Sequence, residues 1–134
     1  MRRRIFSDKD ARKELEAILH PLILQAVQQQ LQTIPKVPYV LIVIPLLVET
    51  GSYRNLLDRV LVVDCLETQQ ITRIMARNAM SAAEAEAILA AQTRRATRLE
   101  VADDTLINTG DVASLHAQIP PLHHKYLQIS RKAL

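Results

Sequence analysis

The chain has 134 residues, of which 49% are hydrophobic, 23% charged and 3% aromatic, with a formal net charge of +3 at pH 7. This length suits one domain with a modest core. A single cysteine excludes an internal disulfide and a cysteine-cluster zinc site, and so few aromatic residues leave no stacking platform for single-stranded nucleic acid. No stretch approaches the roughly 18 unbroken apolar residues of a membrane span. We therefore expect a cytoplasmic protein that binds neither membrane nor nucleic acid.

The first predicted element is helical and covers residues 8–31. Apolar residues recur there at helical spacing and form one continuous stripe. Ser7 and Asp10 have the spacing of a capping box at its start. Because Pro21 interrupts the stripe, we expect two helices or one helix kinked at His20–Pro21. A linker over 33–37 follows.

Two buried strands come next in the chain. The aliphatic run 39–44 has no polar interruption, which is typical of a strand covered on both faces in a parallel sheet. Pro45 should end its pairing. A second run over 60–63 ends in Asp64, and a short amphipathic segment separates the two runs. This arrangement predicts a crossover unit with two parallel strands.

Glu49 and Asp64 are placed just beyond the carboxyl ends of these strands, where open α/β sheets bind ligands. An acid at such a position can hold a ligand hydroxyl or a metal-bound water. It can also simply cap the following helix, and spacing does not decide between these roles.

The second half of the chain alternates helices with one more strand. A helix is predicted over 68–78, and the Ser81–Glu84 capping box opens an alanine-rich helix through about Leu99. Residues 101–108 read as a third strand. Asp111 can cap the last helix, which Pro120–Pro121 should bend or split.

Arginines concentrate between the second and third predicted strands, at positions 73, 77, 94, 95 and 98. Arginine forks match phosphate oxygens and stabilise charge on a transferring phosphoryl group. The alternative is a solvated helix face with some carboxylate pairing, which pattern alone favours. The histidines have no metal-ligand spacing, so we interpret them as structural or surface residues and expect no metal site. The two glycines, Gly51 and Gly110, cannot build a glycine-rich phosphate loop.

From about Phe6 to Ser130 the chain resembles the larger, carboxyl-terminal part of a bacterial dephospho-coenzyme A kinase. The resemblance depends on several short motifs that occur together, in the family's order and at its spacing. They are Leu15 to Ile23, Tyr39-Val40-Leu41 with Pro45 to Glu49, Arg59 to Asp64, Gln70 with Arg73 and Arg77, Ile88 to Gln92, Arg95 to Leu99, Ala102-Asp103-Asp104 and Ile107-Asn108.

The resemblance implies a P-loop kinase-like α/β fold of three layers, with a parallel sheet, a helical insertion and a lid. It implies transfer of the ATP γ-phosphate to the 3′-hydroxyl of dephospho-coenzyme A, with Mg²⁺ in the complete enzyme. Residues 1–36 would form a helical substrate-binding region, 37–67 core strands, 68–99 the lid, and 100–134 the last core strand and helix, all within one structural domain.

The resemblance also implies roles for individual residues. Nucleotide-binding residues on the lid side would be Arg73, Arg77, Arg95, Arg98 and Asn108, with Arg77 and Arg95 the first choices for the ATP phosphates. The residues that line the coenzyme side would be His20, Pro45, Leu46, Leu47, Glu49 and Gln92.

The chain departs from the family pattern at its start. The family begins with a strand, a Walker loop with its Lys and Ser/Thr, and an aspartate that acts on the acceptor hydroxyl, and none of these occurs here. No catalytic residue is therefore predicted, and we expect these 134 residues alone to be inactive. In this fold the first strand would lie between residues 39–44 and 60–64, so the predicted sheet is incomplete at its centre. The alternatives are a non-catalytic remnant that binds coenzyme A-like anions or self-associates, and, less favoured, a basic nucleic-acid-binding module.

Overall fold

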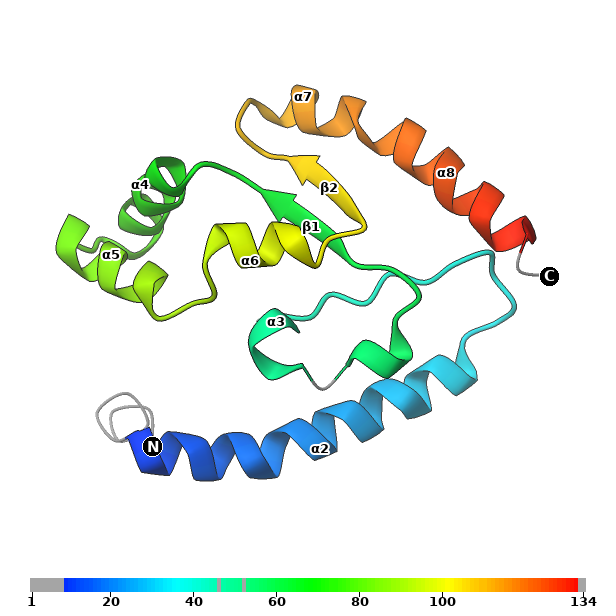
Figure 1. The fold of residues 1–134 in the computed structure, drawn as a ribbon, viewed down its shortest axis with the longest axis horizontal. Helices are drawn as coiled ribbons and strands as arrows, with labels where there is room; N and C mark the ends of the chain where they lie inside the picture. Colours follow the sequence, from blue (N-terminus) through cyan, green and yellow to red (C-terminus); the bar gives the residue numbers. More distant parts are fainter. Residues whose placement is uncertain (1–8, 46, 52, 133–134) are drawn as a thin grey trace. The chain divides into compact units, whose positions relative to one another are not determined.

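The computed structural model describes residues 9–45, 47–51 and 53–132. It divides into two compact units, Met1–Val37 and Pro38–Leu134, each of which is considered by itself (Figure 1). The predicted cap at Ser7 lies outside the described residues. No helix in the part of the chain described is long and apolar enough to cross a membrane.

The first unit contains one helix, α2 (Lys9–Thr33), which continues through Pro21. The predicted alternative of two separate helices is therefore wrong. A proline removes one backbone hydrogen bond, and the good helix formers on both sides, mainly Leu, Ala and Gln, maintain the remaining turns. Much of the apolar stripe is open to solvent within this unit, with Ile18 61% and Leu22 56% exposed.

The second unit is organised around two parallel strands, β1 (Leu61–Asp64) and β2 (Asp104–Ile107). Leu61 lies opposite Asp104, and Asp64 lies opposite Ile107. The pairing extends past Asp64, whose carbonyl oxygen accepts a hydrogen bond of 2.7 Å from the backbone N–H of Asn108. The predicted second and third strands are confirmed, and they form the parallel sheet that the resemblance implies. The predicted crossover unit of residues 39–44 with 60–63 is not formed.

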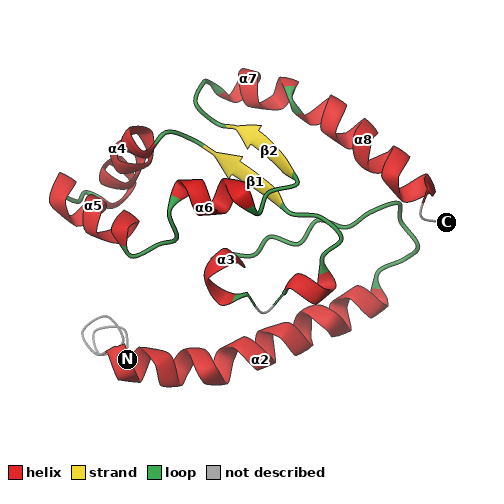
Figure 2. Cartoon of the chain, in the orientation of Figure 1, coloured by secondary structure: helices red, strands yellow, loops and turns green. Residues whose placement is uncertain are grey.

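The predicted first strand over 39–44 is wrong: these residues form a loop without ladder hydrogen bonds (Figure 2). Val40, Leu41 and Val43 are exposed, with Leu41 62% and Val43 91% accessible, whereas Ile42 and Ile44 are half-buried. The physical reason is the absence of a partner. β1 pairs only with β2 among the described residues, and an extended segment with no neighbour cannot form a ladder.

Helices surround the two strands. They are α3 (Leu47–Thr50), the 3₁₀ turn η1 (Arg54–Leu56), α4 (Glu67–Asn78), α5 (Ala82–Ala90), α6 (Arg95–Glu100), α7 (Val112–Ala117) and α8 (Ile119–Lys132). Helix α4 packs against α5, α6 packs against β1, and α7 packs against α8 (Figure 1).

The Ser81–Glu84 capping box is confirmed: the Ser81 backbone N–H donates to the Glu84 carboxylate at 2.8 Å, and the Glu84 N–H donates to the Ser81 hydroxyl at 3.3 Å. The predicted single helix from there to Leu99 is wrong, because α5 ends at Ala90 and α6 begins at Arg95. Arg94 takes an extended ψ of 145°. Gln92 and Arg95 therefore do not belong to one helix.

The carboxyl-terminal helices behave as predicted. The Asp111 carboxylate accepts a hydrogen bond of 2.7 Å from the Ser114 N–H and caps α7. The helix is split at Gln118, just before the two prolines. Pro120 and Pro121 then occupy the first turn of α8, where a missing N–H costs least.

Candidate functional site

The candidate site lies at the carboxyl end of β1, where Asp64 meets Arg95 at the start of α6. The Arg95 Nε donates to Asp64 Oδ1 at 2.8 Å, and Nη2 donates to Oδ2 at 2.5 Å. This is a bidentate fork-to-carboxylate pair. The Asp64 side chain is only 5% exposed, whereas that of Arg95 is 34% exposed. The pair therefore joins a buried carboxylate to a guanidinium that still reaches solvent.

Electrostatics keep this carboxylate ionised. The hydrogen bond from Arg95 lowers the pKa of Asp64, and the charges of Arg95 and Arg98 act in the same direction against the effect of burial. The same bond raises the pKa of Arg95. The charge of Glu67, at the start of α4, also acts on Arg95, so two acids and two arginines meet at this end of β1. The guanidinium groups therefore offer an anion directed N–H donors and not an excess of positive charge.

Arg98, one helical turn beyond Arg95, is also held by hydrogen bonds. Its Nη1 donates to the Thr93 carbonyl at 2.6 Å, and its Nη2 lies 3.5 Å from Gln70 Oε1. Gln70 in turn donates from Nε2 to the Cys65 carbonyl at 2.9 Å. The loop after β1, helix α4 and helix α6 are thus linked around two oriented guanidinium groups.

The other predicted nucleotide residues have fewer restraints. Asn108 follows β2, and its backbone N–H donates to the Asp64 carbonyl at 2.7 Å. It therefore lies at the same carboxyl end of the strands as Asp64. Arg73 and Arg77 are exposed on α4 and have no bonded partner within the described part of the chain. The structure therefore groups Arg95, Arg98 and Asn108 around Asp64 and leaves the α4 pair solvated.

The predicted coenzyme-side residues belong to several elements. His20 is half-buried on α2 in the first unit, Pro45 is exposed before α3, and Gln92 is half-buried between α5 and α6. Leu47 begins α3, and its carbonyl accepts a hydrogen bond of 3.2 Å from the N–H of Gly51. Leu46 and the Glu49 side chain lie outside the described part of the structure. Glu49 belongs to a helical turn rather than to the end of a strand.

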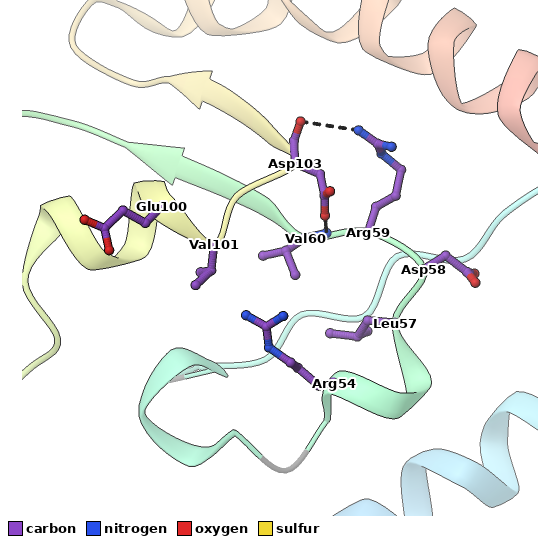
Figure 3. Close-up of a pocket in the computed structure, with 8 residues that line it drawn as sticks. All are labelled: Arg54, Leu57, Asp58, Arg59, Val60, Glu100, Val101 and Asp103. Atoms are coloured by element: carbon purple, nitrogen blue, oxygen red, sulfur yellow. Dashed lines mark hydrogen bonds between the residues drawn. The ribbon is translucent and has the colours of Figure 1, made fainter.

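A hollow of about 320 Å³ opens at the opposite ends of the strands, near their first residues (Figure 3). Hydrogen bonds within its wall satisfy two of its charged groups: the Asp103 carboxylate accepts from the Val60 N–H at 2.7 Å, and its carbonyl accepts from Arg59 at 3.3 Å. The lining contains two arginines and three acidic residues, so its net charge does not favour the binding of an anion. The lining residues are Arg54, Leu57, Asp58, Arg59, Val60, Glu100, Val101 and Asp103.

Sequence reasoning missed two contacts of this site, the pairing of Asp64 with Arg95 and the contact of Gln70 with Arg98. A signal for the first was present. A buried strand that ends in aspartate requires a nearby cation, and an arginine-rich segment follows thirty residues later. Asp64 caps no helix, since Leu66 is the N-cap of α4 and no side chain bonds there.

The family model described as dephospho-CoA kinase matches residues 1–114. The chain belongs to this family. The predicted family resemblance is thereby confirmed.

Curated relatives agree. The chain is 51% identical over 130 residues to a dephospho-CoA kinase of Dechloromonas aromatica, covering 97% of this chain and 62% of the relative. It is also 51% identical over 134 residues to a dephospho-CoA kinase of Thiobacillus denitrificans, covering 100% of this chain and 66% of the relative. The chain thus spans a little less than two thirds of the length of these relatives.

Among solved structures, the crystal structure of TT1252 from Thermus thermophilus superposes with a TM-score of 0.75 at 30% identity, covering 92% of this chain and 63% of that one. Together with the parallel sheet and family membership, this similarity confirms the predicted α/β class of P-loop kinase-like fold. The family thus has a fold in which the carboxyl ends of strands face the ligand.

Proposed function

We propose that the protein to which these residues belong is a kinase that phosphorylates the ribose 3′-hydroxyl of dephospho-coenzyme A with ATP, the last step of coenzyme A synthesis. In this reaction the hydroxyl oxygen bonds to the γ-phosphorus while the bond from that phosphorus to the β,γ-bridging oxygen breaks and ADP leaves. One structural observation supports the proposal best. Two arginines on α6 are held by hydrogen bonds at the carboxyl end of β1, where this fold class binds ligands.

Arg95 and Arg98 are assigned to the ATP phosphates in this proposal. Charge spreads over the γ-phosphate oxygens in the transition state, and oriented guanidinium groups stabilise it with little reorganisation. Arg73 and Arg77 on α4 are exposed and supply further positive charge from the lid. Asn108, beside Asp64 through the backbone, is assigned to the neighbourhood of the adenine.

The acceptor is assigned to the remaining predicted residues. Pro45, Leu46, Leu47 and Glu49 would line the coenzyme side of the cleft. His20 and Gln92 would contribute from α2 and from the segment between α5 and α6. A base must accept the hydroxyl proton, and the resemblance assigns that role to an aspartate that these 134 residues do not include.

The described residues do not fit a protein-held Mg²⁺. They contain no group of three acidic, histidine or cysteine side chains that could hold a metal ion. Both oxygens of the buried Asp64 are already bonded to Arg95. In the complete enzyme Mg²⁺ would accompany the ATP phosphates. We assign no described residue as a ligand of this ion.

The 134 residues by themselves should not catalyse the transfer. The β- and γ-phosphates require a cradle of backbone N–H groups from a glycine-rich loop with its lysine. The glycines of this chain serve other purposes: Gly51 takes a φ of +61° in the turn after α3, and Gly110 follows β2.

The test is an ATP-dependent phosphorylation assay with dephospho-coenzyme A in two arms. The 134-residue chain alone should give no product. A fusion protein tests the converse. It joins the unmatched third of the Thiobacillus denitrificans relative to the amino terminus of this chain, and it should produce coenzyme A. Substituting Arg95 by Ala in the fusion should lower kcat/KM by roughly 10²-fold, as expected for the loss of one preorganised charge donor.

Two results would contradict separate parts of the proposal. Product formed by the chain alone would contradict only its expected inactivity without a phosphate loop. A folded fusion that hydrolyses ATP but leaves dephospho-coenzyme A unmodified would contradict the substrate assignment. As a matched control, Arg54→Ala removes an exposed arginine at the other end of the strands and should leave the rate unchanged.

A second candidate function is binding without catalysis. It is favoured by the arginine pair, which is fully formed in these residues without any phosphate loop. This candidate predicts measurable heat when the chain is titrated with dephospho-coenzyme A in the absence of ATP. An absence of heat at millimolar ligand would leave the kinase as the only supported function.

A further inference from the structure

We propose that Asp64 is a positioning residue that aims the guanidinium of Arg95 at a bound phosphate. The inference deepens the proposed function and rests on it. It starts from the geometry of the ion pair, in which Asp64 engages only the Nε and Nη2 edge of the guanidinium.

The unused edge of the guanidinium is the important feature. An arginine side chain has five N–H donors in a planar fork, and Asp64 takes one on Nε and one on Nη2. The three remaining donors lie on the two terminal nitrogens, and no bond from Nη1 to another described residue is formed. Two of these donors can hold a phosphate side by side. Asp64 and a phosphate can therefore bind the same guanidinium at once, from different edges.

The burial of the pair supports this arrangement. Asp64 is 5% exposed at the end of a strand, so the sheet fixes its position, whereas Arg95 is 34% exposed and lies with part of its side chain in solvent. A long arginine side chain loses considerable rotamer freedom when it binds a ligand. An anchor at its inner edge means that this freedom is already lost before the phosphate arrives.

Net charge and side-chain positioning predict opposite effects on anion binding when the Asp64 carboxylate is removed. Removing a carboxylate next to a phosphate site makes the site more positive and should strengthen anion binding. Removing an anchor should weaken it. Asp64→Asn therefore separates the two effects, and Asp58→Asn provides the matched control. Asp58 is exposed, has no bonded partner among the described residues, and its substitution changes the net charge equally.

The experiment is an NMR titration of the 134-residue chain with inorganic tripolyphosphate. Asp64→Asn should weaken binding about tenfold while its amide spectrum stays that of a folded chain. Asp58→Asn should leave the Kd within twofold of the original or slightly improve it. Equal or tighter binding by Asp64→Asn would overturn the positioning role.

A measurement without any substitution protects the test against a variant that does not fold. The Nε–H resonance of Arg95 should keep the downfield position of a carboxylate-bonded donor when tripolyphosphate saturates the site. A shift to the position of a free donor would mean that phosphate displaces Asp64, which contradicts the proposal.

The failure of this inference can be distinguished from failure of the proposed function. If millimolar tripolyphosphate does not shift the Arg95 resonance of the unsubstituted chain, the phosphate site itself is refuted, and the positioning role is refuted with it. If the chain binds and the Asp64 variant binds equally well, only the positioning role is refuted.

Discussion

Two aspartates with little solvent exposure form ion pairs in the second unit. Asp64 lies at the end of β1, and Asp104 lies at the start of β2. Asp104, with a side chain 6% exposed, accepts hydrogen bonds from Arg59 Nε at 2.9 Å, from the Tyr126 hydroxyl at 3.1 Å and from the Lys125 ammonium. Burial would raise the pKa of Asp104, but these bonds together hold it below its usual value. Burial and the bond to Asp104 raise the pKa of Tyr126 to about 12.

Asp104→Asn should destabilise the chain by about 2 kcal/mol. The substitution leaves two cations facing a neutral amide, and the cost of losing a buried acceptor is reduced because Arg59 and Lys125 are 32% and 47% exposed and screened by water. Urea unfolding followed by circular dichroism measures the change. Asp58→Asn, at an exposed carboxylate, should shift the midpoint by less than a quarter as much, and equal shifts would contradict the prediction.

Stability should also fall in acid. The pKa values of Asp64 and Asp104 are lowered in the folded chain, so the unfolded chain takes up these protons first as the pH falls. The stabilisation is complete above about pH 5 and is lost progressively below pH 4, near the ordinary aspartate pKa. Urea midpoints measured from pH 7 to pH 3 should show this loss, and Asp104→Asn should flatten it. A profile unchanged down to pH 3 would refute the assignment.

At the scale of elements, the two edges of the sheet differ. The outer edge of β2 is closed by a side chain: Gln118 accepts from the Ile107 N–H at 2.8 Å and donates to the Ile107 carbonyl at 2.8 Å, so its amide imitates a neighbouring strand. The outer edge of β1 has no strand beside it among the described residues. Gln118 is the C-cap residue of α7, so this helix positions the side chain that bonds to β2.

Gln118→Ala should destabilise the chain by about 1 kcal/mol, because hydrogen bonds at a solvated edge are partly replaced by water. Hydrogen exchange of the Ile107 amide should accelerate at least tenfold, since the acceptor that it has among the described residues is removed. Gln128→Ala on α8 is the matched control, as Gln128 is exposed and has no bonded partner in the described structure. An Ile107 amide that stays protected in the Gln118 variant would show that the edge closes by another route.

At the scale of the whole molecule, the second unit combines an open strand edge with an exposed aliphatic segment. Val40, Leu41 and Val43 are 42%, 62% and 91% exposed. Unpaired edges and apolar segments of this kind promote association between chains.

The isolated chain should therefore self-associate through residues 40–43, and Val43→Lys should reduce the association without loss of stability, because Val43 is almost fully exposed. Sedimentation velocity over a range of concentrations measures it. Val112→Lys on α7, a position 68% exposed, is the control and should have no effect. A monomer at every concentration would refute this expectation.

Local patterns were sufficient for much of the second unit. The strand ending at Asp64, the capping box at Ser81, the Asp111 cap and the helix break before Pro120 all depend on residues a few positions apart. Such interactions act over one or two turns or along one strand, so composition and spacing contain them. The motifs also identified the family, since their order along the chain is itself a property of the sequence.

Only the tertiary structure decided which groups meet. Arg95 bonds Asp64 across 31 residues, and a pattern that shows five arginines does not indicate which one a buried acid selects. Residues 39–44 have every local property of a strand, yet a strand exists only where a partner supplies its hydrogen bonds. Propensity is local, whereas pairing of strands and of charges depends on what the folded chain brings alongside.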